Sequence, residues 1–317
     1  MSSILVTGGL GAVGSFLVEE LESRGHDVYV IDLAHNHNAH KYARCDVSEF
    51  RQLERIWTGG GWPFGYDTRR KKFDYVYHLA AEFGRWNGED YYETLWKSNA
   101  IGTKNIIRMQ EREGFKAIYF STSEVYGDFE EKMSENVMDN FEIKQMNDYA
   151  LSKWVNEQQV LNSAQQFNTK SVRVRLFNTY GPGEYYSPYR SVICLFIYRA
   201  LHNIPYIVYK GHKRTSTYIT DCVRTLANIS DNFKSGKVYN IGGTDYHDIE
   251  TASSIILKAT GKTEDDLVTY KDSEILTTKH KIIDSTEAHR DLDHVTTVGL
   301  EEGIENTVAW AKNIYNI

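Results

Sequence analysis

The fold class of this chain is decided by the stretch TGGLGAVG, residues 7–14. It follows the apolar run Ile4-Leu5-Val6 and leads into residues 13–24, where apolar side chains recur with helical spacing. A second apolar run, residues 28–31, is typical of a strand that is buried on both faces of a parallel sheet. Strand, glycine turn, helix and strand in this order predict a dinucleotide-binding β-α-β unit.

The glycines of the turn have the spacing GxxGxxG, which suits a phosphate-binding backbone. Glycine permits a tight turn and a close approach to a pyrophosphate, which then lies at the free N–H groups of a helix N-terminus. Asp32 ends the second strand, where a carboxylate accepts hydrogen bonds from ribose hydroxyls and repels a 2′-phosphate. Leu33 and Ala34 supply no arginine for such a phosphate, so NAD is favoured over NADP. The predicted contacts here are Gly8, Gly11, Ala12, Val13, Gly14 and Asp32.

Strands and helices continue to alternate through the first half of the chain. Apolar runs at 74–79, 117–120 and 171–176 predict strands, and the segments 91–113 and 149–166 predict helices. This alternation predicts an α/β fold, a doubly wound parallel sheet of the Rossmann type. After about residue 180 the pattern loosens. We therefore expect an NAD-binding domain over 1–178 and a smaller, mainly helical substrate-binding portion over 179–317, interleaved with the first.

The composition excludes several classes of function. The 317 residues carry a net charge of −7, and the pI is near 5.9, which argues against binding nucleic acid through bulk charge. No apolar stretch is long enough to span a membrane, and the N-terminus does not resemble a signal peptide. The three cysteines are scattered without metal spacing, as in a reducing cytoplasm.

Two unusual segments are interpreted conservatively. The run 35–40 holds three histidines but follows directly on a predicted strand, so a polar loop is favoured over a metal site, and no metal is expected. Residues 57–72, rich in glycine, aromatic and basic residues, are expected to form a surface insertion. Contact with a partner is the less favoured interpretation of that insertion.

A candidate catalytic pair stands on the helix predicted over 149–166. Tyr149 and Lys153 are four residues apart and therefore share a helix face. A lysine beside a phenol lowers the pKa of the phenol, which makes the tyrosinate a fitting base for a sugar hydroxyl. Upstream, the stretch STSEVYG, residues 121–127, follows a buried strand, at the edge where open α/β sheets place their chemistry.

Taken together, these motifs resemble the extended short-chain dehydrogenase/reductase family, in particular its NAD-dependent nucleotide-sugar epimerases, dehydratases and decarboxylases. The resemblance covers nearly the whole chain. It rests on these stretches: TGGLGAVG at 7–14, HLAA at 78–81, STSEVYGD at 121–128, YALSK at 149–153 and RLFNTYGP at 175–182, together with Asp32, Asn99, Gly102 and Thr103.

The resemblance implies a role for individual residues. Thr122 is similar to the catalytic hydroxyl of the family, Tyr149 to its base and Lys153 to the helper that also binds the nicotinamide ribose. Further cofactor contacts are implied at Asp46, Val47, Leu79, Ala80, Ala81, Asn99 and Ser121. Substrate contacts are implied at Thr122, Ser123, Glu124, Asn178, Tyr209 and Arg214. Asn178 and Arg214 correspond to diphosphate-binding positions, and Tyr209 to an aromatic that stacks on the nucleobase.

Glu124 bears on the reaction that follows oxidation at the sugar's C4. A nucleotide-sugar 4-epimerase needs no extra carboxylate, whereas a 4,6-dehydratase needs a base for C5, and a UDP-glucuronate-type decarboxylase also carries Thr-Ser-Glu. Ser123 stands where many dehydratases have an acid, and YALSKW differs from the decarboxylases' usual YDEGKR. The 4-epimerase is therefore favoured, with the dehydratase and the decarboxylase as alternatives.

Two further expectations concern class and assembly. A sensor that binds NAD and a nucleotide sugar without turnover is the alternative from another class, and the intact Thr122, Tyr149 and Lys153 argue against it. The family resemblance also implies a homodimer, with the helices predicted at 91–113 and 149–166 as candidates for its interface.

Overall fold

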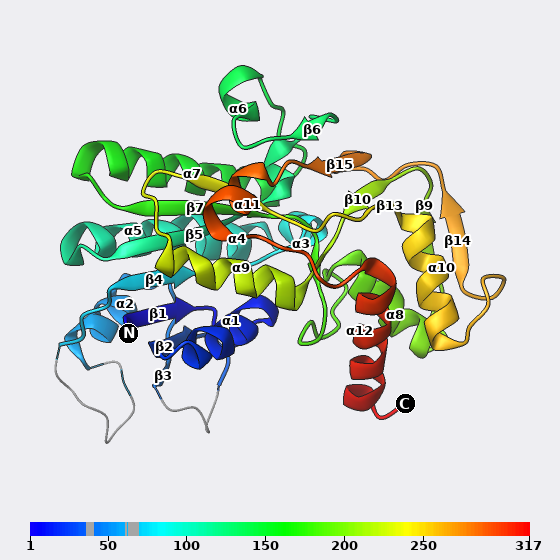
Figure 1. The fold of residues 1–317 in the computed structure, drawn as a ribbon, viewed down its shortest axis with the longest axis horizontal. Coiled ribbons are helices and arrows are strands. Elements are labelled where there is room, and N and C mark those ends of the chain that lie inside the picture. Colours follow the sequence, from blue (N-terminus) through cyan, green and yellow to red (C-terminus); the bar gives the residue numbers. More distant parts are fainter. Residues whose placement is uncertain (36–40, 61, 63–69) are drawn as a thin grey trace.

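The computed structural model describes residues 1–35, 41–60, 62 and 70–317, and a seven-stranded sheet forms its centre (Figure 1). All neighbouring strands are parallel, in the order β12-β7-β5-β4-β1-β2-β3. The strand order reverses beside β1, and such a switch point opens a crevice at the carboxyl ends of the strands. The strands are β1 (Ser3–Thr7), β2 (Asp27–Asp32), β3 (Tyr42–Arg44), β4 (Tyr75–His78), β5 (Lys116–Thr122), β7 (Ser171–Leu176) and β12 (Val238–Ile241).

Helices cover both faces of this sheet, as its sequence pattern predicts. Successive side chains of β1 point to opposite faces: Ile4 and Val6 pack into one buried cluster, and Leu5 packs into another. The first cluster includes side chains of α1 (Ala12–Ser23), α9 (Ile219–Asp231) and α11 (Thr286–Leu292). The second includes side chains of α2 (Phe50–Thr58), α5 (Gly102–Glu113) and α7 (Asp148–Phe167). The predicted doubly wound α/β fold is confirmed.

The C-terminal portion holds strands that the sequence analysis did not predict. A four-stranded sheet has the order β13-β10-β15-β6, and two pairs, β11-β8 and β14-β9, lie beside it. These strands are only two to four residues long, too short for a periodic pattern to stand out. The elements are β8 (Thr179–Tyr180), α8 (Val192–Leu201), β9 (Tyr206–Tyr209), β10 (Lys213–Thr215), β11 (Thr217–Tyr218), β13 (Tyr246–Asp248), α10 (Ile249–Thr260), β14 (Val268–Lys271), β15 (His280–Ile283) and α12 (Leu300–Tyr315).

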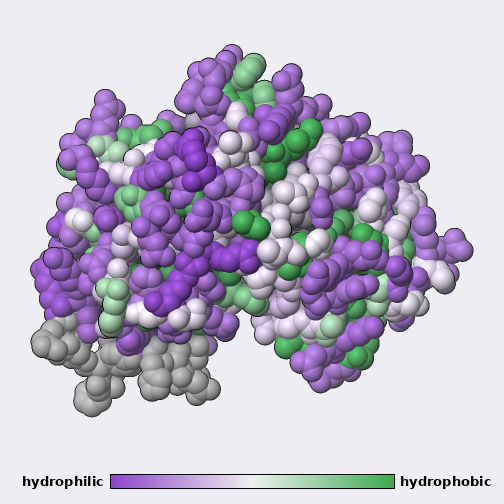
Figure 2. Space-filling view, viewed as in Figure 1, coloured by the Kyte–Doolittle hydropathy of each residue, from purple (hydrophilic) through white to green (hydrophobic). Residues whose placement is uncertain are grey.

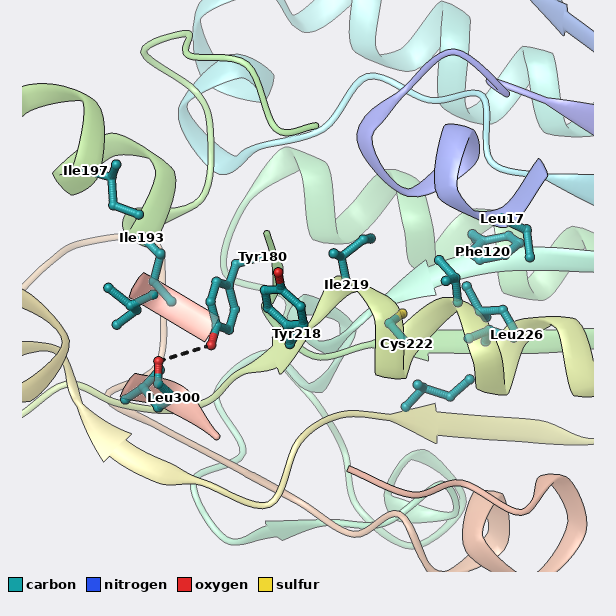
Figure 3. Close-up of a cluster of buried hydrophobic side chains, with 14 of the residues drawn as sticks. Leu17, Phe120, Tyr180, Ile193, Ile197, Tyr218, Ile219, Cys222, Leu226 and Leu300 are labelled. Carbon is teal, nitrogen blue, oxygen red and sulfur yellow. Dashed lines mark hydrogen bonds between the residues drawn. The ribbon is translucent and has the colours of Figure 1, made fainter. Parts of the chain in front are cut away.

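The chain crosses between the two parts several times. β12 comes late in the sequence but pairs with β7 in the large sheet, and β6 (Lys132–Met133) comes early but pairs with β15 in the small one. Apolar side chains bridge the parts: Leu17, Tyr180 and Ile193 belong to one buried cluster (Figure 3). Within it, the Tyr180 hydroxyl donates to the carbonyl oxygen of Leu300 at 3.4 Å. The two parts therefore share one core.

The helix predicted over 91–113 is interrupted. The structure has α4 (Tyr92–Trp96), one π-helical turn (Lys97–Ile101) and then α5, preceded by α3 (Arg85–Asp90). The π-helical turn directs the side chain of Asn99 into the interior, where the residue has no exposed surface. A 3-10 turn (Ser123–Tyr126) and α6 (Val137–Asn140) complete the described elements of the first half.

The segment 57–72 is a surface insertion only in part. Trp57, in the last turn of α2, is 1% exposed and Trp62 is 8% exposed, so both side chains pack into the same buried cluster as Leu5. Residues 61 and 63–69 lie outside the described residues, as do residues 36–40 of the histidine run. Within the described parts of the chain, no cluster of His, Cys, Asp and Glu could hold a metal ion.

Hydrophilic residues dominate the face shown in Figure 2, with apolar residues in small groups between them. Of the helices in the described ranges, none is long and apolar enough to cross a membrane.

Candidate active site

The glycine turn between β1 and α1 leaves no room for side chains. Gly8 has a φ of +70°, and a Cβ there would lie 2.7 Å from the backbone nitrogen of Ala80. A Cβ on Gly14 would lie 2.1 Å from the carbonyl oxygen of Gly8. Gly11 precedes α1 without a side-chain cap, so the first-turn N–H groups, those of Ala12 and Val13, have no acceptor within the helix. This cradle fits a pyrophosphate.

Asp32 is held beside the cradle. Its carboxylate accepts hydrogen bonds from the backbone N–H groups of Leu10 at 3.0 Å and of Ala34 at 3.1 Å. These bonds fix the side chain and leave lone pairs for the two hydroxyls of a ribose. The geometry fits the adenosine half of NAD.

Arg44 is a basic residue near Asp32 that the sequence analysis did not consider. β3 places it directly across from Asp32 in the sheet, and its Nε donates to the carbonyl oxygen of Leu33 at 3.0 Å. The sequence shows Arg44 as a basic residue after the second strand, but only the pairing of β3 with β2 places it beside Asp32.

The other residues implied in cofactor binding surround the cradle. Thr7 fixes the loop after β4, because its carbonyl oxygen accepts from the Leu79 N–H and its hydroxyl from the Ala80 N–H, both at 3.1 Å. Asp46 instead holds a local turn, in which its carboxylate accepts from the N–H and the hydroxyl of Ser48 at 2.8 and 2.6 Å. Val47 is buried, and Ala81 is exposed after β4.

Asn99 and Ser121 direct their side chains to protein groups. The Asn99 side chain accepts from the N–H of Glu82 and donates to its carbonyl oxygen, both at 2.9 Å, and also donates to the hydroxyl of Ser152 at 3.0 Å. It thereby joins the loop after β4 to α7. The Ser121 hydroxyl donates to Glu157 at 2.6 Å. These two side chains thus position the walls of the site.

The structure brings Thr122 and Tyr149 together. Thr122 ends β5, and its side chain lies near enough to that of Tyr149, on α7, to lower the pKa of the phenol. The same hydroxyl accepts the N–H of Glu124 at 3.2 Å and so caps the 3-10 turn. Asn147 caps the first turn of α7, where its side chain accepts from the Ala150 N–H at 2.8 Å. The end of β5 and the first turn of α7 therefore fix the positions of the Thr122 and Tyr149 hydroxyl groups.

Burial is the largest influence on the pKa of Tyr149 in this structure, and the Lys153 ammonium is engaged elsewhere. This ammonium donates to the carbonyl oxygen of Phe120 at 3.0 Å and lies 6.0 Å from the centre of the Tyr149 ring. Burial raises the pKa of Tyr149 above its usual value, although Thr122 acts in the opposite direction. Burial also lowers the pKa of Lys153 to about 8.

Glu124 lies in a cluster of cations that the sequence analysis did not identify. Its carboxylate forms an ion pair with the ammonium of Lys281, whose side chain is 2% exposed. Burial alone would raise the pKa of Glu124, but Lys281, Arg85 and Arg214 together lower it to about 2. Burial and the neighbouring arginines lower the pKa of Lys281 to about 8, against the pull of Glu124. No sequence pattern marks Lys281, because β15 reaches the site through its pairing with β10 and β6, which lie far away in the sequence.

Arg214 is buried and not a surface charge. It is 6% exposed, and its guanidinium donates to the carbonyl oxygens of Lys213 and Lys279 at 2.8 and 2.9 Å. Asn178 lies beside this strand, since its side chain donates to the carbonyl oxygen of Thr215 at 2.9 Å. The two residues implied in diphosphate binding are thus neighbours.

Tyr209 and Ser123 occupy the flanks of this region. Tyr209 ends β9, with its ring centre 5.9 Å from that of His212. Ser123 is 3% exposed at the start of the 3-10 turn.

Comparison with known proteins accords with this geometry. The family model of NAD-dependent epimerases and dehydratases matches residues 4–242. The chain belongs to that family. NAD, the family's cofactor, fits the glycine cradle and Asp32, and membership favours an enzyme over a sensor.

The similarity to individual proteins is moderate but extends over the full length. The chain is 29% identical to a UDP-N-acetyl-α-D-glucosaminuronate decarboxylase of Bacillus cytotoxicus, over 98% of each chain. It is 25% identical to a putative UDP-glucose 4-epimerase of Methanocaldococcus jannaschii, again over 98% of each. An epimerase structure from Methanothermobacter thermautotrophicus matches with a TM-score of 0.88 and 25% identity, over 99% of this chain and 93% of the other.

Proposed function

We propose that this enzyme is an NAD-dependent decarboxylase of a nucleotide-linked uronic sugar. The observation that carries the proposal is the buried ion pair between Lys281 and Glu124, and Glu124 stands two residues after Thr122. The sequence alone favoured a 4-epimerase. The ion pair favours a reaction that needs a fixed proton donor beside the sugar, and the 29% identical relative is named as such a decarboxylase.

The state of Glu124 argues against a dehydratase. A base that removes the C5 proton needs appreciable proton affinity. With a pKa lowered to about 2, the Glu124 carboxylate is a weak base. Its role in this proposal is to hold the Lys281 ammonium in place and, with its free lone pairs, to accept a hydrogen bond from a sugar hydroxyl.

The reaction follows from elementary chemistry. The glycine cradle and Asp32 would hold NAD, which would supply the hydride acceptor for C4 of the sugar and the hydride that is returned at the end. Tyr149 must lose its own proton before it takes that of the C4 hydroxyl, and the neighbouring Thr122 favours this by lowering the pKa of Tyr149 against the effect of burial. The resulting 4-ketone is β to the C6 carboxylate, so the C5–C6 bond breaks, carbon dioxide leaves, and the electron pair passes into an enolate. Lys281 then donates a proton to C5, and its lowered pKa, about 8, makes it a ready donor at neutral pH.

We place the nucleotide diphosphate along the small sheet. The Arg214 guanidinium suits an anionic diphosphate, and Asn178 lies beside it. The Tyr209 ring offers a stacking surface for the base. Since both curated relatives described above are named as acting on UDP sugars, UDP is the nucleotide we propose.

The experiment is product analysis of the NAD-loaded enzyme by liquid chromatography and mass spectrometry. UDP-glucuronate, UDP-N-acetylglucosaminuronate and UDP-glucose are the substrates. We expect loss of carbon dioxide from a uronate and no change in UDP-glucose. An isomer of unchanged mass would establish the 4-epimerase instead, and loss of water would establish a dehydratase. Either result would overturn the proposal.

We also propose that the enzyme forms a homodimer through α5, α7 and the π-helical turn. These elements pack against one another. They expose apolar side chains at Ile101, Leu151 and Leu161, which a partner copy would cover.

A further inference from the structure

We propose that Arg85 recognises the carboxylate of the sugar and that Glu274 occupies its guanidinium until the sugar binds. This inference rests on the proposed function, because it assumes a uronic acid as the substrate. It assigns substrate specificity to a residue that lies outside the stretches 121–128 and 149–153, which carry the candidate catalytic residues.

The position of Arg85 is fixed by the backbone before it. Gly84 has a φ of +105°, and a Cβ there would lie 2.8 Å from the carbonyl oxygen of Tyr189. Only glycine fits this turn at low cost. Arg85 follows as the first residue of α3, and its side chain is 22% exposed. The guanidinium is thereby held at one place in the site.

The hydrogen bonds of Arg85 are incomplete. Its Nη2 donates to Oε2 of Glu274 at 3.2 Å, and its Nη1 lies 3.1 Å from the same oxygen. The buried Nη1 has no aligned hydrogen-bond partner. Arginine and carboxylate commonly pair through two parallel bonds to two oxygens. Since Glu274 offers a single oxygen, the donors of Arg85 are available to a better placed carboxylate.

The surroundings of Arg85 connect it to the reacting end of the site. Its charge lowers the pKa of Glu124 and of Lys281. Arg85, Lys281 and Arg214 are three cations that face two carboxylates, Glu124 and Glu274. Cations therefore outnumber carboxylates here, which favours the binding of further anionic groups such as the sugar carboxylate and the diphosphate proposed at Arg214.

Glu274 lies in a loop that can stay in place when the Glu274 side chain leaves Arg85. Residues 272–279 join β14 to β15, and the site holds this connection at three other points. His212 accepts the Glu274 N–H at 3.2 Å, Asn147 donates to the carbonyl oxygen of Leu276 at 2.9 Å, and Arg214 donates to the hydroxyl of Thr277 at 3.3 Å. The Glu274 side chain can therefore exchange its partner while the connection stays in place.

The test is equilibrium binding to the NAD-loaded Tyr149→Phe enzyme, which prevents turnover during titration. UDP, UDP-glucose and UDP-glucuronate are titrated calorimetrically into three proteins: this parent, Arg85→Met and Glu274→Gln. Exposed Arg51, on α2, supplies the matched control Arg51→Met. Thermal unfolding and NAD content show that each variant is folded.

We expect Arg85→Met to weaken UDP-glucuronate roughly 10- to 100-fold, the value of charge-assisted hydrogen bonds, and to leave UDP and UDP-glucose nearly unchanged. We expect Glu274→Gln to tighten UDP-glucuronate about 2- to 5-fold, because a partly exposed competing ion pair is lost. If Arg85→Met does not fold, the Glu274→Gln result alone decides.

Equal weakening of all three ligands by Arg85→Met would make Arg85 a diphosphate contact and overturn the inference. Weaker UDP-glucuronate binding in Glu274→Gln would also overturn it. Failure of the proposed function looks different. In that case UDP-glucuronate binds in an Arg85-dependent way, but the enzyme with Tyr149 intact releases no carbon dioxide.

Discussion

Two buried lysines at the reacting end of the site define its chemistry at the scale of single residues. Lys153 and Lys281 both have a pKa lowered to about 8, chiefly through burial. Only Lys281 forms an ion pair with Glu124. A lysine ammonium in such surroundings gives up its proton more easily than one in water.

The first prediction concerns the pH dependence of turnover. Lys281 must be protonated to donate to C5, so activity is present below its pKa of about 8 and declines above it. Lys153 has the same pKa and would give the same alkaline limb. Lys281→Arg separates them, because arginine stays protonated throughout. We expect a lower kcat/KM, because arginine gives up a proton less readily than Lys281, with the alkaline limb of the residual activity moved to higher pH; an unchanged limb would assign it to Lys153.

The second prediction tests proton donation itself. Lys281→Met removes the donor, and we expect kcat to fall about 100-fold or more, the usual contribution of a positioned acid. Oxidation at C4 does not need Lys281, so reduced cofactor should accumulate at 340 nm, the ordinary NADH absorbance. Lys279→Met, in the connection before β15, is the control. Full turnover by Lys281→Met would contradict the role of Lys281.

Part of the site could be predicted residue by residue, and part could not. Thr122, Tyr149 and the glycines stand in short stretches whose spacing carries the chemistry. Lys281 and Arg85 stand in no such stretch and reach Glu124 only through the tertiary fold. The direction in which the pKa of Tyr149 shifts could not be predicted from the sequence either, because it depends chiefly on how deeply the fold buries the phenol.

At the scale of elements, the π-helical turn between α4 and α5 holds α7, the helix that carries Tyr149 and Lys153, in position. The π-helical turn directs Asn99 between the loop after β4 and Ser152 on α7. α7 carries both Tyr149 and Lys153. Periodicity predicted the helical segment but not its interruption, since a π turn is local and leaves the surrounding apolar spacing intact.

The third prediction follows from that support. Asn99→Ala leaves the two Glu82 backbone groups without their partner and removes the donor to the Ser152 hydroxyl, which keeps its bond to the carbonyl oxygen of Tyr149. We expect the free energy of unfolding to fall by about 1–3 kcal/mol, the cost of buried unsatisfied groups, and kcat to fall with it. Chemical denaturation and steady-state kinetics measure the two effects. Exposed Asn140→Ala is the control, and a variant as stable and active as the parent would contradict the prediction.

At the scale of the whole molecule, chain crossings unite the two parts around the site. β12 completes the large sheet, and β6 completes the small one. Strand-helix alternation predicted five of the seven strands of the large sheet, because those strands are apolar on both faces, but it did not predict β3 or β12. The short strands of the small sheet have no such pattern, and their pairing over long sequence separations is a tertiary property.

The fourth prediction concerns assembly. Ile101→Glu combined with Leu151→Glu places charges on the exposed apolar face of the π-helical turn and α7. We expect light scattering to give a dimer for the parent and a monomer for the variant, because buried unpaired charges are costly. Val295→Glu, exposed elsewhere, should remain dimeric. A monomeric parent would contradict the proposed interface.

The most direct test of the decarboxylase is turnover of UDP-glucuronate in deuterated water. Proton donation to C5 after loss of carbon dioxide predicts a pentose product with one deuterium on carbon, at C5. A 4-epimerase returns the same hydride to C4 and takes no proton from solvent onto carbon. A six-carbon product without carbon-bound deuterium would contradict the account. A product deuterated at C5 and lacking C6 is the result that it predicts.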